Sequence, residues 1–260
     1  MNTWVLLRGL ARDSRHWGTF PAMLKQALPE DARVIALDLP GNGTLHRKRS
    51  PTSAARMVDS YRSQLAALDL REPVNLLGLS LGCMVAIQWA ASHPADLLSA
   101  VLVNGSCADL APARKRMQPG AAWQLFVAAT LRDESVREQR IVGACTNLAH
   151  VETVAAQWAA YARKGRTRPS NVVRQLLAAA RFRLPPQRPT VPLLVLASAA
   201  DRLVHPDCSI EIARYWGLPI LLHPSAGHEV ALDDPAWLVR QCTRWVGGAH
   251  VPSRPPSSWK

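Results

Sequence analysis

The sequence predicts an α/β protein with an open, mostly parallel sheet of about six strands and helices on both faces. Each candidate strand is short, mostly aliphatic and free of polar alternation, as expected for parallel strands that are covered on both faces. Helix-like stretches separate these runs, and repetition of strand, helix and strand is typical of a parallel sheet. The runs are TWVLLR (3–8), RVIALDL (33–39), PVNLLG (73–78), SAVLVN (99–104), VPLLVLAS (191–198) and LPILLH (218–223).

Helices are predicted between and after these strands, over 53–69, 82–92, 207–216 and 235–246. The rhythm breaks once, between 106 and 188, where the pattern is helical and contains no convincing strand. We therefore predict a core made of 1–105 and 189–246, with a helical cap over 106–188 inserted after the fourth strand. Residues 247–260 are polar and rich in proline, so we predict a disordered tail.

The composition is that of one large domain, or of a core with an insertion, in a chain of 260 residues. No run reaches the roughly 18 apolar residues of a membrane span. The chain enters a strand-like run at once, without a basic leader, which favours a cytoplasmic protein. The five cysteines form no CxxC or other metal-binding spacing, so we expect reduced packing residues and no metal site.

One hydroxyl interrupts the apolar run NLLGLSLGCMV. The third strand is predicted to end at about Gly78 and the next helix to begin at about Leu81, which leaves Ser80 in a tight turn. Such a turn strains its central residue and crowds the positions two before and two after it, and Gly78 and Gly82 relieve that crowding. The hydroxyl then projects at a helix N-terminus, where a nucleophile belongs. A chance match in a strand-to-helix loop is the alternative.

A serine nucleophile needs a general base that is oriented by a carboxylate, in the chain order serine, acid, histidine. Asp201 follows the strand at 191–198, and His228 lies in the loop after the strand at 218–223. Both loops open on the same edge of the sheet as Ser80. The plainer alternatives are a helix-capping or surface acid and a loop histidine that bonds to the backbone.

Four motifs carry a resemblance to a known family: GLSLG (78–82), SAADRLVHP (198–206), SAGHEV (225–230) and LDLPGNG (37–43). With them the chain resembles the α/β-hydrolase superfamily, specifically its small cap-bearing serine hydrolases, over about residues 3–246. The resemblance implies that Ser80 attacks an acyl carbon, that His228 takes its proton and that Asp201 orients the imidazole. It implies no metal and no organic cofactor. We expect the fold to lack the hairpin that commonly precedes the first strand in this family.

The chain departs from that family in the loop after the first strand. The usual His-Gly is replaced by Arg8-Gly9-Leu10. The resemblance implies two oxyanion donors, the backbone N–H groups of Leu10 and Leu81. Arg8 has two interpretations: a surface arginine that orders the loop, which we favour, or an arginine that points into the pocket as an anion clamp.

The predicted cap carries most of the positive charge of the chain. Residues 106–188 contain twelve arginines and two lysines but only five acidic residues, so this segment holds nine of the twelve net positive charges. Either amphipathic helices place these arginines in solvent, which we favour, or an apolar pocket lies beneath a positive rim that steers anionic substrates. The candidate pocket residues are Arg8, Gly9, His16, Trp17, Met117, Trp123, Trp158 and Tyr161.

We therefore expect a serine hydrolase that cleaves a small ester, thioester or related acyl compound through an acyl-enzyme. A ligand-binding or signalling module that keeps the pocket with little turnover is the alternative, and lyase or cofactor-free oxygenase chemistry is a third. We expect no nucleic-acid or membrane partner. The family's strand order places 33–39 at an edge of the sheet, and an uncovered edge invites pairing. A homodimer along this strand is one expectation.

Overall fold

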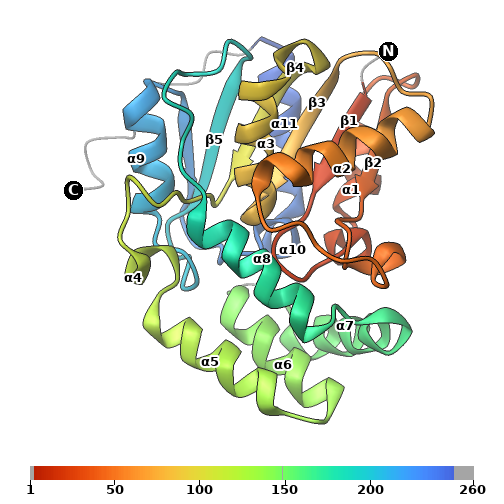
Figure 1. Ribbon diagram of the computed structural model, residues 1–260, viewed down its shortest axis with the longest axis vertical. Coiled ribbons are helices and arrows are strands. Elements are labelled where there is room, and N and C mark those ends of the chain that lie inside the picture. The colour runs from red at the N-terminus through yellow and green to blue at the C-terminus, as the bar shows by residue number, and fades with distance from the viewer. Residues whose placement is uncertain (1–2, 148, 249–260) are drawn as a thin grey trace.

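Six parallel strands form a single sheet in the computed structural model, which describes residues 3–147 and 149–248 (Figure 1). The strand order is β2-β1-β3-β4-β5-β6, and every neighbouring pair is parallel. The fold class predicted from the sequence is confirmed. The strands are β1 (Thr3–Leu7), β2 (Arg33–Leu37), β3 (Val74–Leu79), β4 (Leu97–Val103), β5 (Leu193–Ser198) and β6 (Ile220–His223).

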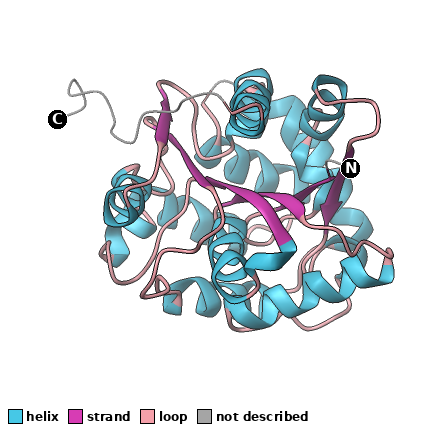
Figure 2. Cartoon of the chain, turned by 90° about the horizontal axis from the view of Figure 1, so that it is seen from above, coloured by secondary structure: helices cyan, strands magenta, loops and turns pink. Residues whose placement is uncertain are grey.

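Helices cover both faces of this sheet (Figure 2). Neighbouring residues of β3 show why the strands are apolar throughout: Leu76 enters the core on one face and Leu77 the core on the other. Helices α2, α3 and α9 contribute to the first core, and α1 and α11 to the second. Their bounds are α1 (Phe20–Ala27), α2 (Ala54–Ala67), α3 (Leu81–Ser92), α9 (Asp207–Trp216) and α11 (Pro235–Val246).

The segment between β4 and β5 is helical, and the part of it that the structure describes contains no strand. Three of its helices, α5, α6 and α7, gather at one end of the molecule, and α8 lies between them and the sheet (Figure 1). The division of the chain into core and cap stays a prediction, and the name cap is kept for 106–188. Most of the predicted tail, 249–260, lies outside the described residues. The helices are α4 (Ala113–Arg116), α5 (Pro119–Thr130), α6 (Glu134–Cys145), α7 (Val151–Gly165) and α8 (Pro169–Arg181).

The strand order decides which loops meet. In an open parallel sheet, functional groups gather at the carboxyl ends of the strands. The segments after β1, β3, β5 and β6 all leave from that edge, and they carry Arg8, Ser80, Asp201 and His228. Strand β2 is an edge strand, as predicted, and its pairing with a second copy stays a prediction. None of the helices that the structure describes is long and apolar enough to cross a membrane.

Candidate active site

Ser80 occupies the turn between β3 and α3, and its φ of 58° lies in the left-handed region that L-residues rarely adopt. Glycines on both sides permit this turn. A Cβ on Gly78 would lie 2.3 Å from the carbonyl oxygen of Gly82, and one on Gly82 would lie 2.1 Å from that of Leu7. The N–H of Ser80 donates to the carbonyl of Val103, at 2.9 Å, which anchors the turn to β4. The side chain is half-buried.

His228 and Asp201 are joined by a buried hydrogen bond of 2.7 Å between Nδ1 and Oδ2. The other carboxylate oxygen of Asp201 accepts the N–H groups of Leu203 and Val204, at 2.8 and 3.0 Å, so the carboxylate has a fixed orientation. Donation from Nδ1 leaves Nε2 as the basic nitrogen of the imidazole. Burial alone lowers the pKa of His228, but the charge and hydrogen bond of Asp201 outweigh it and raise this pKa.

The loop that carries His228 is fastened between α6 and β4. A Cβ on Gly227 would lie 2.7 Å from the carbonyl oxygen of Cys145, at the end of α6. The same carbonyl accepts the N–H of Glu229 at 2.9 Å. On the other side, Nδ2 of Asn104 donates to the carbonyl of His228 at 2.9 Å. The glycine of the SAGHEV motif is therefore required for a close approach of this loop to α6.

Residues 8–17, the loop after β1, pass beside the serine turn, and we call them the oxyanion loop for the role that the resemblance implies. A Cβ on Gly9 would lie 3.2 Å from the Cβ of Ser80, so a larger residue would crowd the nucleophile. Oε1 of Gln175, on α8, accepts the N–H of Ala11 at 2.8 Å. Within 3–147 and 149–248, no acceptor is found for the N–H of Leu10.

Leu81 is the first residue of α3, where backbone N–H groups have no intrahelical acceptor. The helix dipole adds partial positive charge at the same place. Leu81 directly follows Ser80, so this donor stands beside the candidate nucleophile. The N–H groups of Leu10 and Leu81 thus remain available for the role that the resemblance implies.

Arg8 is only 4% exposed, so the interpretation that we favoured, a surface arginine, is wrong. Its Nη2 lies 2.9 Å from Oε1 of Glu229, the residue after His228. Its guanidinium lies over the ring of Trp17, 4.8 Å from the centroid. Burial alone raises the pKa of Glu229, but the charge of Arg8 outweighs it and lowers this pKa. Both groups are therefore charged, and Arg8 is already paired within the protein.

A second ion pair, between a half-buried arginine and a buried glutamate, joins the oxyanion loop to the cap. Nη1 of Arg12 lies 3.0 Å from Oε2 of Glu138 on α6, a charge contact without hydrogen-bond alignment. The guanidinium of Arg12 also lies over the ring of Trp158 on α7, 4.2 Å from its centroid. His16 contacts Trp158 and Tyr161 edge-on, with ring centroids 4.8 and 5.4 Å apart. The loop is thus packed against α6 and α7.

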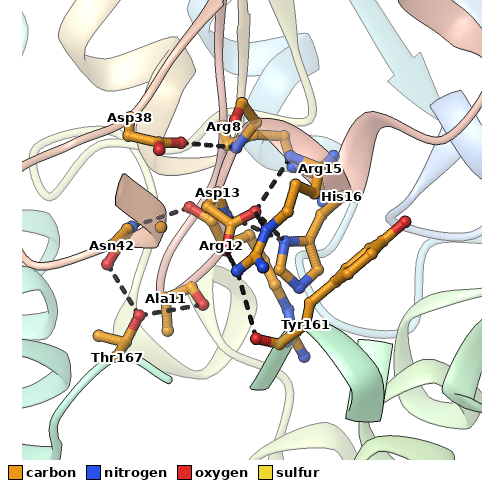
Figure 3. A network of polar contacts seen from close by, with 12 residues as sticks. Arg8, Ala11, Arg12, Asp13, Arg15, His16, Asp38, Asn42, Tyr161 and Thr167 are labelled. Carbon is orange, nitrogen blue, oxygen red and sulfur yellow. Dashed lines mark hydrogen bonds and ion pairs between the residues drawn. The ribbon is translucent and has the colours of Figure 1, made fainter. Parts of the chain in front are cut away.

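Asp13 organises the middle of this loop (Figure 3). Its carboxylate lies 2.7 Å from Nη2 of Arg15 and 3.0 Å from Nδ1 of His16. Nη2 of Arg15 also donates to the carbonyl of Tyr161 on α7, at 3.3 Å. Burial alone raises the pKa of Asp13, but its hydrogen bonds with His16 and Arg15 outweigh it and lower this pKa. Asp13 is therefore an ionised structural group and not a candidate acid.

A buried network of amides and hydroxyls joins α8 to the same loop. Nε2 of Gln175 donates to Oδ1 of Asn42 at 2.7 Å and to Oγ of Ser50 at 3.0 Å. Oγ1 of Thr167 also donates to Oδ1 of Asn42, at 2.9 Å. Asn42, in turn, donates to the carbonyl of Arg12 at 2.8 Å (Figure 3). The cap is therefore bound to the core beside the oxyanion loop through buried polar groups that satisfy one another.

The sequence profile of the alpha/beta hydrolase family matches residues 4–241. The chain belongs to this family. Uncharacterized protein Rv2715 of Mycobacterium tuberculosis is 34% identical over 108 residues, which are 41% of this chain and only 30% of that protein. A hydrolase from Pseudomonas aeruginosa PA01 matches with a TM-score of 0.76 and 22% identity, over 95% of this chain and 90% of that one.

A further solved structure, the 2-hydroxy-6-oxo-6-phenylhexa-2,4-dienoate hydrolase (BphD) of Rhodococcus sp. strain RHA1, matches with a TM-score of 0.72. It is 18% identical and covers 95% of this chain and 91% of that one. At such identities the likeness shows the fold. The family and the fold together support a hydrolase.

The candidate pocket residues of this alpha/beta hydrolase do not all lie around one open pocket. Trp123 is 62% exposed and stacks on Phe126, so its placement in the pocket is wrong, because this face of α5 points to solvent. Trp17 is wholly buried in the core and cannot line an open pocket. Met117 is half-buried against a small cluster that includes Leu203 of the Asp201 loop. A cavity of about 730 Å³ lies between α5 and α6, and neither Ser80 nor His228 lines it.

Several arginines of the cap bind backbone carbonyls at helix ends. Arg116 donates to the last turn of α8, at Ala179 and Ala180. Arg137, which is buried, donates to Ala128 and Leu131 at the end of α5 and pairs with Glu134. A cation near a helix C-terminus is favourable because of the helix dipole. These arginines stabilise the cap and are not free to form a positive rim.

Sequence reasoning missed the polar groups that hold the oxyanion loop: Arg12, Asn42, Ser50, Glu138, Thr167, Gln175 and Glu229. One signal was present for Glu229, because it follows His228 in a motif and an arginine ends the first strand. The others are polar residues in loops and helices, and only the fold brings them together. Among the residues that the structure describes, no group of three His, Cys, Asp or Glu side chains could hold a metal ion.

Proposed function

We propose that this protein is a serine hydrolase that cleaves a small ester, thioester or related acyl compound through an acyl-enzyme on Ser80, His228 and Asp201. The observation that carries the proposal is the buried 2.7 Å hydrogen bond between His228 and Asp201. It leaves Nε2 as the basic nitrogen, on the sheet edge where Ser80 occupies a strained turn. Few structural roles require a strained serine and an oriented histidine together.

In the proposed reaction, Nε2 of His228 takes the proton of the Ser80 hydroxyl as the oxygen attacks the acyl carbon. The N–H groups of Leu10 and Leu81 stabilise the oxyanion that forms. The imidazolium then gives its proton to the leaving alcohol or thiol. A water molecule repeats the sequence on the acyl-enzyme, and the serine is regenerated with release of the acid.

The buried charges favour a neutral substrate. Arg8 and Arg12, the arginines of the oxyanion loop with the lowest exposure, each face a buried glutamate. A paired arginine has little attraction left for a substrate carboxylate, and separating the pair would leave a charge buried and unpaired. An uncharged short or medium acyl group therefore fits this site better than an anionic one.

Labelling with a fluorophosphonate probe tests the proposal, followed by p-nitrophenyl esters of graded acyl length. We expect the label on the peptide that contains Ser80, and we expect Ser80→Ala to abolish labelling and turnover. Loss of one member of such a triad lowers turnover by roughly 10⁴ to 10⁶. A label on another residue would overturn the assignment. Ligand-induced thermal stabilisation without turnover would support the ligand-binding module instead.

A further inference from the structure

We propose that Arg8 and Glu229 are a positioning pair, which fixes the oxyanion loop relative to His228 and balances the charge around its imidazole. This inference rests on the proposed function, because it assigns the pair to the base of that reaction. Arg8 directly follows β1 and precedes Gly9 and Leu10 of the oxyanion loop. Glu229 directly follows His228. One side-chain contact therefore joins the two segments that must be in register for acyl transfer.

The contact is short and enclosed. Nη2 of Arg8 and Oε1 of Glu229 lie 2.9 Å apart, and the two side chains are 2% and 5% exposed. The residues are 221 positions apart in the sequence. Backbone contacts hold each partner: the N–H of Glu229 donates to the carbonyl of Cys145, and Gly82 packs against the carbonyl of Arg8. Movement of either loop would separate the two charges.

Stability alone does not account for this pair. Nε and Nη1 of Arg8 and Oε2 of Glu229 are buried with no hydrogen-bond partner among the described residues. Two charges that leave water for a single hydrogen bond lose much of their hydration, and apolar residues of similar volume often stabilise a core better. The pair therefore points to a task that apolar residues would not perform.

The surroundings of His228 indicate what that task is. The charged groups with the largest effects on its imidazole are Asp201, Glu229 and Arg8, while the thiol of Cys145 stays neutral because burial raises its pKa to about 12. Asp201 and Glu229 favour the imidazolium, and Arg8 opposes it. The two members of the pair shift the pKa of His228 in opposite directions. Together they therefore leave this pKa near the value that Asp201 sets.

Because Arg8 and Glu229 have opposite effects on the imidazolium of His228, their variants can distinguish a positioning pair from simple packing. In Glu229→Gln the imidazolium loses a favourable charge, so the acidic limb of kcat/KM against pH moves to lower pH. In Arg8→Gln it loses an unfavourable charge, so the limb moves to higher pH. We expect each displacement to be at least about half a pH unit. The double variant returns the limb towards that of the unmodified enzyme.

The chain offers a matched control in Glu138→Gln. It breaks the other Arg–Glu pair of the oxyanion loop, the one that contacts α6, and we expect it to leave the acidic limb in place. The conservative variant Arg8→Lys keeps the charge and should also keep the limb. Displacement of both Gln variants in one direction, or thermal destabilisation with an unmoved limb, would overturn the proposal.

An NMR titration of the His228 imidazole in the Ser80→Ala background provides a readout that needs no turnover. We expect its midpoint to fall in Glu229→Gln and to rise in Arg8→Gln. If the midpoints move in this way while the fluorophosphonate labels another residue, the proposed function fails and the pairing stands. If Ser80 is labelled and the midpoints do not move, the function stands and the pairing fails.

Discussion

Gln175 of the cap accepts the N–H of Ala11 at 2.8 Å and thereby holds the loop backbone directly after Leu10. The φ of Ala11 is 56°, a left-handed conformation that an alanine holds only when its surroundings impose it. The side chain of Gln175 is wholly buried and also donates to Asn42 and Ser50. A residue of the cap therefore sets the local backbone of the candidate oxyanion hole.

This contact predicts the effect of Gln175→Met. The variant keeps the approximate volume but leaves the N–H of Ala11 without an acceptor, which costs about 1–3 kcal/mol for a buried group. It also removes one of the two hydrogen bonds that Oδ1 of Asn42 accepts, while the one from Thr167 remains. We expect a lower free energy of unfolding in urea, and a fall in kcat that exceeds any rise in KM. Leu176→Ala, at an exposed position of the same helix, is the control and should change stability by no more than about 0.5 kcal/mol. An unchanged kcat in a folded Gln175→Met would contradict this role.

Two glycines in helices of the chain make a second, matched prediction. A Cβ at Gly82 would lie 2.1 Å from the carbonyl oxygen of Leu7, which is backbone and cannot move aside, whereas a Cβ at Gly120 would meet nothing within 4 Å. We expect Gly82→Ala to lose the proposed esterase activity and most of its stability. Gly120→Ala should be neutral or more stable by up to about 1 kcal/mol, because alanine loses less backbone entropy in a helix. Thermal melts of the two variants provide the comparison. Equal melts would show that the serine turn tolerates expansion.

The sequence predicted the fold and the two ends of the Ser80 turn because each depends on local patterns. Apolar runs without alternation specify buried parallel strands, and Gly78 and Gly82 mark the one turn that needs them. The surroundings of Arg8 could not be predicted in the same way. Its partner is 221 residues away, and a single arginine at a strand end is compatible with solvent or with a buried glutamate. The prediction that Trp123 lines the pocket failed for a related reason, because composition does not say which face of a cap helix is covered.

The pH dependence of activity follows from His228. Its pKa is raised above the ordinary value of about 6.5 because Asp201 stabilises the imidazolium more than burial opposes it. In the proposed reaction His228 must be neutral to accept a proton, so kcat/KM is expected to fall as the pH drops through this raised pKa. We expect the acidic limb above pH 6.5, and Asp201→Asn to move it down while lowering kcat. A limb well below 6.5 in the unmodified enzyme would show that burial prevails over Asp201.

The charge of the substrate should have little effect on turnover. Arg8 and Arg12 are paired with glutamates, and Arg116 and Arg137 donate to helix-end carbonyls, so these arginines attract a substrate anion only weakly. A free buried arginine would add a charge-assisted hydrogen bond of about 1.5–3 kcal/mol, which corresponds to about tenfold to a hundredfold in kcat/KM.

The comparison is a monoester of a dicarboxylic acid against the neutral alkyl ester of equal length, at low and at high ionic strength. We expect the neutral ester to be turned over at least as well at both. Steering by exposed charges would fade with salt, because the Debye length falls from about 10 Å at 0.1 M to about 3 Å at 1 M. An anionic preference of tenfold that persists at high salt, and that disappears in a folded Arg8→Gln, would mean that Arg8 leaves Glu229 to bind the substrate.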